Sequence, residues 1–545
     1  MTDRPGDSVD GAAALGRASA VLASGTIVSR TLGFVNAIVL AAAIGYIGAA
    51  ADGFTLATQI PNSIYALIAG GLLSAVLVPQ IVRAGINADG GAQFINKLVT
   101  LGTVVLVVVA AVATLCAPWL VALYAQTGDR GFSADELALA TAFAYWCLPQ
   151  VLFYGLYSLL GQVLNARRVF GPFTWAPALN NVIGIVGITT FIVIFGGDPA
   201  HRDASTWTTP MIALLGATAT LGIAVQALVL TLFWRRAGLR FRPDFRWRGV
   251  GLARTGQAAA WVFGMILITQ IAAIVETRVA TTASGDASLG ALKYAWLIFM
   301  LPHSIVTVSI VTAYFTRMSS HARDGKLAEV RGDVVSSLRS ILLIMIFSTV
   351  GLIVLAYPFS AIFGGGVDEV RALGNVVIAY LIGLIPFTIL FVLQRVFYAL
   401  DDTRTPFFIQ VFQSALFVIG VLWVATLPSE WIGVGIANVL TVTGTAQTVL
   451  TAILVRRRLP GSWPPGLARH VAWFAGAAVV AGAVGAVLVW VLGEFSIDSR
   501  VGGVVTLVVV GALMAAVYAG ILALAKNEAL FALVDPVVAR LRSRR

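Results

Sequence analysis

The sequence predicts an all-α protein that crosses a membrane many times. Of its 545 residues, 59% are hydrophobic and 11% are charged, and the mean hydropathy is +0.91. A soluble protein of this length would have to expose far more apolar surface than folded soluble proteins do. The apolar runs are long and continuous, whereas a membrane β-barrel shows short segments of alternating polarity. Composition and run length together therefore favour a bundle of transmembrane helices.

Polar residues and Gly or Pro breaks divide the chain into fourteen expected transmembrane helices. Each has room for the roughly 20 residues that cross a bilayer. The expected helices lie at 18–46, 54–82, 97–125, 135–164, 172–196, 207–234, 254–283, 288–316, 338–364, 371–400, 405–427, 431–455, 467–493 and 501–525.

The basic residues predict the orientation. If both termini are cytoplasmic, 4 of the 36 basic residues lie in outer loops and 4 within helices, which leaves 28 on the cytoplasmic side. Such an excess is typical of cytoplasmic loops, so the net charge of +11 indicates membrane topology and not a nucleic-acid partner. We expect a multi-pass protein of a bacterial plasma membrane with both termini in the cytoplasm.

Two internal matches indicate a repeat. Ile60–Ile64 (IPNSI) resembles Leu301–Ile305 (LPHSI), 241 residues later, and Leu148-Pro149 resembles Ile385-Pro386, 237 residues later. The matching elements are an even number of expected helices apart, so both copies would have the same orientation. The repeat predicts two six-helix lobes related by a pseudo-twofold axis along the membrane normal, a design suited to alternating access.

The expected domain organisation follows from the repeat and the charge runs. It comprises a cytoplasmic tail at 1–17, an N-terminal lobe at 18–234, a basic linker at 235–253, a C-terminal lobe at 254–458, two extra helices within 459–526 and a basic tail at 527–545. The Arg, Trp and Phe content of the linker predicts a helix lying at the membrane surface beside anionic lipids. No connection is long enough for a soluble catalytic domain.

Arg30 is the strongest single candidate for a functional residue, because it lies within an apolar helix. An arginine at that depth costs about 2.5–3.5 kcal/mol, so its side chain should face protein or a water-filled cavity. Guanidinium binds phosphate oxygens in a two-pronged geometry, which points to an anionic substrate. The structural alternative is a pair with a buried acid or with carbonyls at a helix break.

A second group of charges comprises Glu276, Arg278 and Lys293, in the seventh and eighth expected helices. Residues 276 and 278 are about 200° apart on a helix, so they do not pair with each other. Glu276 could pair with Lys293 and leave Arg278 to face a cavity; the alternative is a charge cluster whose side chains extend to the membrane surface.

Other candidates carry structural readings of equal weight. Asp52, which opens the second expected helix, is either its N-cap or a gating or coupling carboxylate. Gly70-Gly71 and Ser74 allow either backbone exposure to a cavity or close helix packing. Asp401 and Asp402 are expected to lie against Arg404 in a tight turn, with Arg395 in a structural role nearby.

Sequence motifs of energised or metal-dependent enzymes are missing from the chain. It contains no Walker A sequence, and its four histidines lack metal-ligand spacing. Its two cysteines, Cys116 and Cys147, lie in apolar runs and are expected to be inert thiols. We therefore expect no cofactor and no metal, and coupling to sodium, protons or the membrane potential is left unassigned.

These features resemble the MviN/MurJ family of bacterial lipid II flippases, in the multidrug/oligosaccharidyl-lipid/polysaccharide exporter superfamily. The resemblance covers nearly the whole chain. The residues that carry it are Ser29-Arg30, Leu32–Phe34, Ala51–Phe54, Pro61-Asn62, Gly71, Ser74-Ala75, Val78-Pro79, Tyr294-Ala295, Phe397–Asp402, Thr405 and Pro406.

The sequence also departs from the family pattern. Arg and Asp are usual where Asn36 and Ala37 stand, and arginines are usual where Tyr65 and Leu297 stand. The family usually has an acidic residue where Gly70 stands and another where Trp296 stands. Of the cavity arginines of the family, only Arg30 carries over. The sodium site of some members is not evident, because the eleventh expected helix offers Gln410 and Gln413 in place of Asn and Asp.

The resemblance implies a non-enzymatic flippase that moves lipid II from the inner to the outer leaflet for cell-wall synthesis. We expect Arg30, Asn62, Ser74, Arg278 and Lys293 to bind substrate, and Asp52, Glu276 and Gly71 to act in gating or coupling. Expected partners are lipid II, membrane lipids and cell-wall synthesis or division proteins.

Three alternatives stay open. One is an exporter of another polyprenyl-linked glycan, or a drug or cation antiporter of the same superfamily. The second is a polytopic glycosyltransferase or peptidoglycan polymerase, for which Asp368 and Glu369 in a short loop are weak support. The third is a transport-inactive scaffold that recruits cell-wall proteins.

Overall fold

The computed structural model describes residues 5–68, 91–128, 130–167, 169, 171–246 and 256–531, with side chains from residue 24 in the first range and from 260 in the last. Every named element in these ranges is a helix, and the only β-bridge between described residues joins Thr127 to Phe132. The chain forms two compact units, Met1–Gln270 (unit 1) and Ile271–Arg545 (unit 2).

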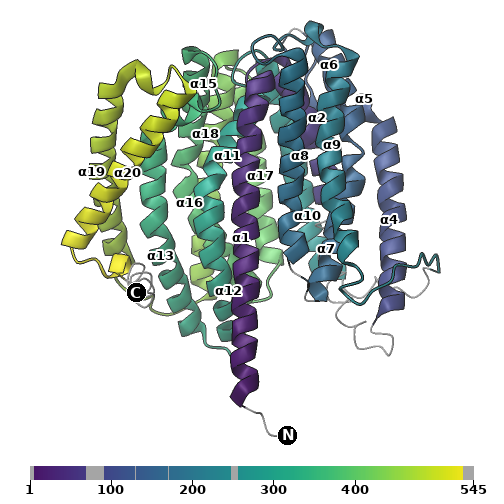
Figure 1. Cartoon of the computed structure of the whole chain (residues 1–545). Helices are drawn as coiled ribbons and strands as arrows, with labels where there is room; N and C mark the ends of the chain where they lie inside the picture. The colour runs from purple at the N-terminus through teal and green to yellow at the C-terminus, as the bar shows by residue number, and fades with distance from the viewer. Residues whose placement is uncertain are drawn as a thin grey trace. The chain divides into compact units, whose positions relative to one another are not determined.

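Unit 1 contains eight α-helices and most of a ninth among its described residues (Figure 1). They are α1 (Pro5–Ile44), α2 (Ala49–Ile68), α4 (Ala92–Leu115), α5 (Ala117–Tyr124), α6 (Ala134–Cys147), α7 (Gln150–Ala166), α8 (Gly171–Phe195), α9 (Thr209–Leu228) and the larger part of α10 (Gly256–Ala280). In this unit, α1 packs along α8, α2 along α6, and α4 along α7.

Unit 2 takes over within α10, whose last ten residues belong to it. Its further helices are α11 (Leu289–Pro302), α12 (Val308–Arg323), α13 (Leu327–Val354), α14 (Ala356–Ala361), α15 (Val367–Ile382), α16 (Leu384–Ala399), α17 (Arg404–Val424), α18 (Ser429–Arg458), α19 (Leu467–Leu492) and α20 (Arg500–Leu524). A π-helical turn at His303–Thr307 joins α11 to α12 directly after Pro302, whose ring disturbs regular helix bonding.

The same helix breaks occur in both units. A long helix is followed by a short one where α4 meets α5 and where α13 meets α14, and each short helix has a proline near its start. Each short helix is followed by a broken one: α6 and α7 break at Leu148-Pro149, and α15 and α16 break at Gly383 with a 41° bend. Both breaks lie close to the matching prolines of the sequence repeat: Pro149 immediately precedes α7, and Pro386 is in the first turn of α16.

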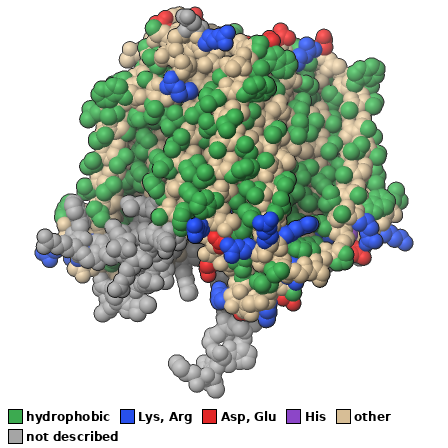
Figure 2. Space-filling view, turned by 180° about the vertical axis from the view of Figure 1, so that it is seen from behind, with side chains coloured by type: hydrophobic (Ala, Val, Ile, Leu, Met, Phe, Trp, Pro, Cys, Tyr) green, Lys and Arg blue, Asp and Glu red, His purple; other side chains and the backbone are tan. Residues whose placement is uncertain are grey.

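Twelve helices of the described chain are long and apolar enough to cross a membrane, and the bent α15–α16 pair makes a thirteenth. The prediction of helical membrane architecture is confirmed, whereas the count of fourteen is not. The remaining expected span, 54–82, corresponds to α2 only as far as Ile68, and 69–82 lie outside the described residues. Figure 2 shows hydrophobic side chains along the middle of the helices and Lys and Arg near their ends.

Helix α1 begins at Pro5 and so continues into the residues expected as a cytoplasmic tail, for which the sequence analysis assigned no secondary structure; the alanine-rich stretch there favours helix. The linker expected as a surface helix has no regular structure at residues 240–246, where Pro243 removes a backbone donor. The rest of the linker, 247–253, and the tail residues 532–545 lie outside the described residues.

Close packing in unit 2 is illustrated by α18. A side chain at Gly433 would meet the carbonyl oxygen of Ala287, in the loop before α11, whereas Gly444 on the same helix has nothing within 4 Å of that position. On the same helix, therefore, Gly433 lies close against another backbone segment, whereas Gly444 faces open space.

Candidate functional site

The position of Arg30 is set by the packing of α1 on α8. The side-chain amide of Asn181 donates a hydrogen bond to the carbonyl oxygen of Ser29 (2.9 Å). Gly33 lies against the Asn181 side chain, and Asn36 contacts Gly184 of α8. Asn36, where the family usually has a charge, therefore packs between helices.

Arg30 itself is exposed and 14 residues, about 21 Å, from the end of α1 at Ile44. It lies within a candidate membrane span, Ser24–Ile44. It makes no hydrogen bond or ion pair with any described residue, so the predicted alternative of a structural pair finds no partner in that part of the chain. The Arg30 guanidinium carries five N–H donors, and α1, which presents it, is held against α8. Such a set of donors suits an anionic ligand.

Asp52 is fully buried in the first turn of α2. Because α2 begins at Ala49, Asp52 lies inside the helix and is not its N-cap. Next to it, Gly53 lies against Ala140 of α6, and Phe54 meets Phe143 edge to face at 5.3 Å. A buried carboxylate at the N-terminal end of a helix is favoured by the helix dipole.

Further along α2, Asn62 is exposed beside Pro61. The side-chain amide of Gln270 donates to the carbonyl oxygen of Ser63 (2.9 Å), which ties α10 to α2 within unit 1. Tyr65, at a family arginine position, stacks on Tyr154 at 5.4 Å. Gly71 and Ser74, the other predicted site residues of this span, lie outside the described residues.

The three charges predicted to cluster in unit 2 do not form the expected pair. Glu276 makes no ion pair with Lys293; it is partly buried and interacts electrostatically with Tyr380 of α15. Lys293 is exposed on the second turn of α11, and Arg278 is partly buried in the last turn of α10. The prediction used the sequence separation of the two helices and could not include α15, which lies a hundred residues away.

An aromatic column follows α11 through its π-helical turn and packs against α15 and α16. Successive ring centroids are 4.7–6.1 Å apart, and its members are Trp296, Phe299, His303, Tyr380, Phe387 and Phe391. Trp296, which stands at a family acid position, and His303, for which the sequence favours a packed neutral histidine over a proton relay, are both part of it. The buried His303 ring is 4.7 Å from Phe387 and 5.1 Å from Phe391.

Arg395 of α16 lies at one end of this column. Its guanidinium carbon is 4.5 Å from the centroid of Phe391, 5.6 Å from Phe315 and 5.9 Å from Tyr398. Like Arg30, it makes no hydrogen bond or ion pair with a described residue. The sequence predicts a structural role for it; the aromatic residues at i−4 and i+3 are a signal that it lies on an aromatic face.

The contacts of α17 and α18 include an uncharged polar network. The Gln410 amide donates to Gln413 Oε1 (3.0 Å) and Ser414 Oγ (3.1 Å), Gln413 donates to Thr443 Oγ1 (3.3 Å), and Gln447 donates to Gln410 Oε1 (3.2 Å). The two glutamines that stand at family sodium-site positions therefore bond with one another. Among the described residues, no group of three or more His, Cys, Asp and Glu is placed to hold a metal ion.

Comparison with known proteins identifies the family. A sequence model described as "Lipid II flippase MurJ" matches residues 40–511 of the chain. The chain belongs to the MurJ family. The family resemblance predicted from the sequence is thereby confirmed; the matched range includes Asp52 and begins ten residues after Arg30.

Relatives and solved structures agree with this assignment. The chain is 27% identical over 436 residues to the probable lipid II flippase MurJ of Haemophilus influenzae, covering 77% of this chain and 82% of that protein. It is 26% identical over 487 residues to that of Rhizobium meliloti, covering 86% of each.

Two solved structures share the fold. One is lipid II flippase MurJ in an inward closed conformation (TM-score 0.69, 17% identity, 90% of this chain and 98% of that one). The other is an inward-facing multidrug resistance MATE family transporter of the MOP superfamily (TM-score 0.57, 16% identity, 75% and 93%). This MurJ family member is thus a multi-span helical protein with a transporter fold.

Proposed function

We propose that this MurJ family member moves lipid II from the inner to the outer leaflet of the plasma membrane by alternating access. Family membership and the names of the relatives support the substrate class. Related transporters of the same fold are solved in inward-facing and outward-facing conformations, which supports the mechanism. No covalent step is needed, because the head group only changes sides.

The observation that carries the proposal is Arg30, a membrane-embedded cation without an acidic partner among the described residues. We assign it to the diphosphate of the substrate, which accepts two-pronged hydrogen bonds from guanidinium. Arg395, held over three rings in unit 2, is assigned to the same anionic class of ligand. Asn62 and Lys293, both exposed, would contribute neutral and charged donors.

The remaining predicted residues keep their proposed roles. Asp52, a buried acid in the first turn of α2, and Glu276, a partly buried acid within a candidate span, would respond to movement of the helices around them. Arg278 would add positive charge, and Gly71 and Ser74 stay sequence-based predictions. Both termini are proposed to be cytoplasmic, with cell-wall synthesis or division proteins as partners.

The test is depletion of the protein in its host, followed by labelling of lipid II on the outer leaflet. We expect depletion to reduce exposed lipid II and wild type to restore it. Arg30→Ala should fail to restore it, Arg30→Lys should restore part, and Thr31→Ala, on the same exposed stretch of α1, should restore it fully at equal protein level.

Two results would contradict the proposal. Unchanged lipid II exposure on depletion would favour an exporter of another glycan, an antiporter or a scaffold. Full restoration by Arg30→Ala would leave the flippase assignment intact and remove Arg30 from substrate binding.

A further inference from the structure

The chain after α9 forms a basic segment that the proposed transport mechanism does not use. Residues 239–246, here called the arginine strap, contain Arg240, Arg242 and Arg246 and a single acid, Asp244. All three arginines are exposed, and none forms an ion pair with a described residue. The strap therefore carries a net charge of +2 that the described part of the chain does not neutralise.

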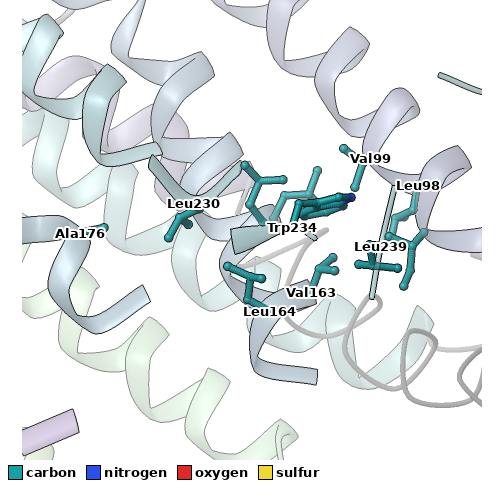
Figure 3. Packing of buried hydrophobic residues seen from close by; sticks show 11 residues of the cluster. Leu98, Val99, Val163, Leu164, Ala176, Leu230, Trp234 and Leu239 are labelled. Carbon is teal, nitrogen blue, oxygen red and sulfur yellow. The ribbon is translucent and has the colours of Figure 1, made fainter. Parts of the chain in front are cut away.

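The start of the strap is fixed in the core of unit 1. Leu239 is 3% exposed and belongs to a buried cluster with Trp234, in the turn before it, Leu98 and Val99 of α4, and Val163 of α7 (Figure 3). Burial of a leucine side chain stabilises by about 1.5–3 kcal/mol. The strap thus leaves the core at one defined point beside α4.

The strap backbone is also bound to α4. The Arg242 N–H donates to Asn96 Oδ1 (3.3 Å) and the Asp244 N–H donates to Thr100 Oγ1 (3.1 Å). The Asp244 carboxylate accepts the backbone N–H of Arg246 (2.9 Å), which shapes the last turn of the strap. A segment without regular structure is in this way held in one conformation by two side chains of a helix.

The strap and α4 together line a cavity of about 770 Å³ that is open on one side. The first turns of α4 contribute Gln93 and Asn96 as polar walls, and the strap contributes its three arginines and Asp244. A volume of this size fits a lipid head group, and the polar walls and guanidinium groups are donors for phosphate oxygens.

The position of this cavity indicates which kind of anion it binds. Its floor is the beginning of α4, a candidate span of 24 residues, so it lies where a span leaves the hydrocarbon region. Phe241 and Phe245, which alternate with the arginines, are 47% and 65% exposed. Exposed phenylalanines beside arginines are typical of a segment at the membrane surface. A free phosphate has no apolar part that could contact these phenylalanines.

We propose that the arginine strap and the first turns of α4 form a binding site for an anionic phospholipid. Its phosphate would lie among Arg240, Arg242 and Arg246, with Phe241 and Phe245 against the acyl chains. The site is separate from Arg30 and does not rest on the proposed transport function. Such a lipid would hold the strap against α4 in the membrane.

The experiment measures lipid binding to the purified full-length protein in uncharged detergent by calorimetry. The probes are dioctanoyl phosphatidylglycerol, dioctanoyl phosphatidylcholine and inorganic phosphate. We expect phosphatidylglycerol to bind preferentially, and the variant R240Q/R242Q/R246Q to lose about tenfold or more in its affinity. Thr100→Val keeps every arginine and removes the acceptor for the Asp244 N–H, together with the bond that the Thr100 hydroxyl donates to the Asn96 carbonyl one turn earlier in α4; it should lose about threefold.

A matched control removes three exposed arginines outside the cavity, in R235Q/R456Q/R457Q, and should change the affinity by less than about twofold. Thermal unfolding in the same detergent establishes that every variant is folded. Equal losses in the two triple variants, or equal binding of both lipids, would overturn the proposal. Displacement of phosphatidylglycerol by equimolar inorganic phosphate would reassign the site to a free anion.

Discussion

Replacing Asp402 with asparagine tests how unit 2 is tied together at one end. The loop between α16 and α17 places Asp402 Oδ1 at 2.9 Å from the Thr405 N–H, and Oδ2 at 2.7 Å from the Thr405 hydroxyl. Oδ2 also accepts from Arg458 at the end of α18 (2.9 Å). The sequence predicts this acid against Arg404; the structure shows that its ion-pair partner is Arg458, 56 residues away.

Asparagine keeps the bond from the Thr405 N–H and loses both bonds at Oδ2. The hydroxyl bond to a charged acceptor contributes about 1.5–3 kcal/mol. The Arg458 pair adds about 0.2–1 kcal/mol, because that side chain is 58% exposed and screened by solvent. Allowing for a hydrogen bond that the asparagine side chain can still make, we expect the free energy of unfolding to fall by about 1.5–3 kcal/mol.

The pH dependence gives a second readout. Burial alone would raise the pKa of the Asp402 carboxyl, but the hydrogen bonds from Thr405 and the charge of Arg458 outweigh it and hold this pKa below its ordinary value. A lowered pKa means stability that is present above the ordinary value, about 3.9, and lost as the pH falls through the folded value. The difference between wild type and Asp402→Asn should be full at pH 7 and close below about pH 4.

The assay is unfolding of purified protein by titration of dodecyl sulfate into mixed micelles, followed by tryptophan fluorescence. Asp401→Asn is the matched control: Asp401 is exposed at a φ of 56°, which asparagine tolerates, so its change should stay within about 0.5 kcal/mol. Equal stability of Asp402→Asn and wild type at pH 7, or a stability difference that does not narrow as the pH falls below about 4, would refute the reasoning.

Three further predictions follow from the contacts described above. Gly433→Ala should lower the free energy of unfolding by about 1–3 kcal/mol, because the added methyl group meets a backbone carbonyl. The control Gly444→Ala should leave the free energy of unfolding unchanged or raise it by up to about 1 kcal/mol. Equal effects of the two substitutions would contradict the packing of α18. In a cysteine-free protein in whole cells, Arg130→Cys should react with a membrane-impermeant maleimide and Arg235→Cys only after permeabilisation; the reverse pattern would invert the proposed orientation. Arg395→Lys should restore more outer-leaflet lipid II to depleted cells than Arg395→Gln, and identical restoration would leave Arg395 a structural residue.

The fold was predictable because its main determinants are local in sequence. Spans are read from continuous apolar runs, and the helix breaks from proline, which acts on its own turn. The breaks at Pro149 and at Gly383, three residues before Pro386, are marked by a repeat within the sequence itself. The strap was mispredicted because Arg, Trp and Phe content does not distinguish a surface helix from an extended segment, and its conformation depends on Asn96 and Thr100 of a distant helix.

The candidate site was less predictable, because its contacts join helices far apart in the chain. Sequence spacing offered Lys293 as the partner of Glu276, yet the two form no ion pair, and Glu276 interacts electrostatically with Tyr380 of α15. Likewise, the aromatic residues at i−4 and i+3 of Arg395 were readable from one helix, whereas Phe315, the third ring around it, was not. Composition and spacing locate charges along a helix, but only packing assigns their partners.

The partners of the arginines bear directly on function. Three arginines each have an acid within 3 Å, in the pairs Arg202–Asp198, Arg317–Asp333 and Arg458–Asp402. Arg30, well inside a candidate span, and Arg395, four residues from the end of one, have no acid among the described residues. A charge at the centre of a span costs about 2.5–3.5 kcal/mol unless something compensates it; among these residues, Arg30 has no aromatic face beside it of the kind that Arg395 has. If a protein acid compensated the Arg30 charge, Arg30→Ala would leave that acid uncompensated and destabilise the protein. If the substrate compensates the charge, Arg30→Ala should be at least as stable as wild type and lose only transport. Measuring both properties on the same variant separates the two explanations.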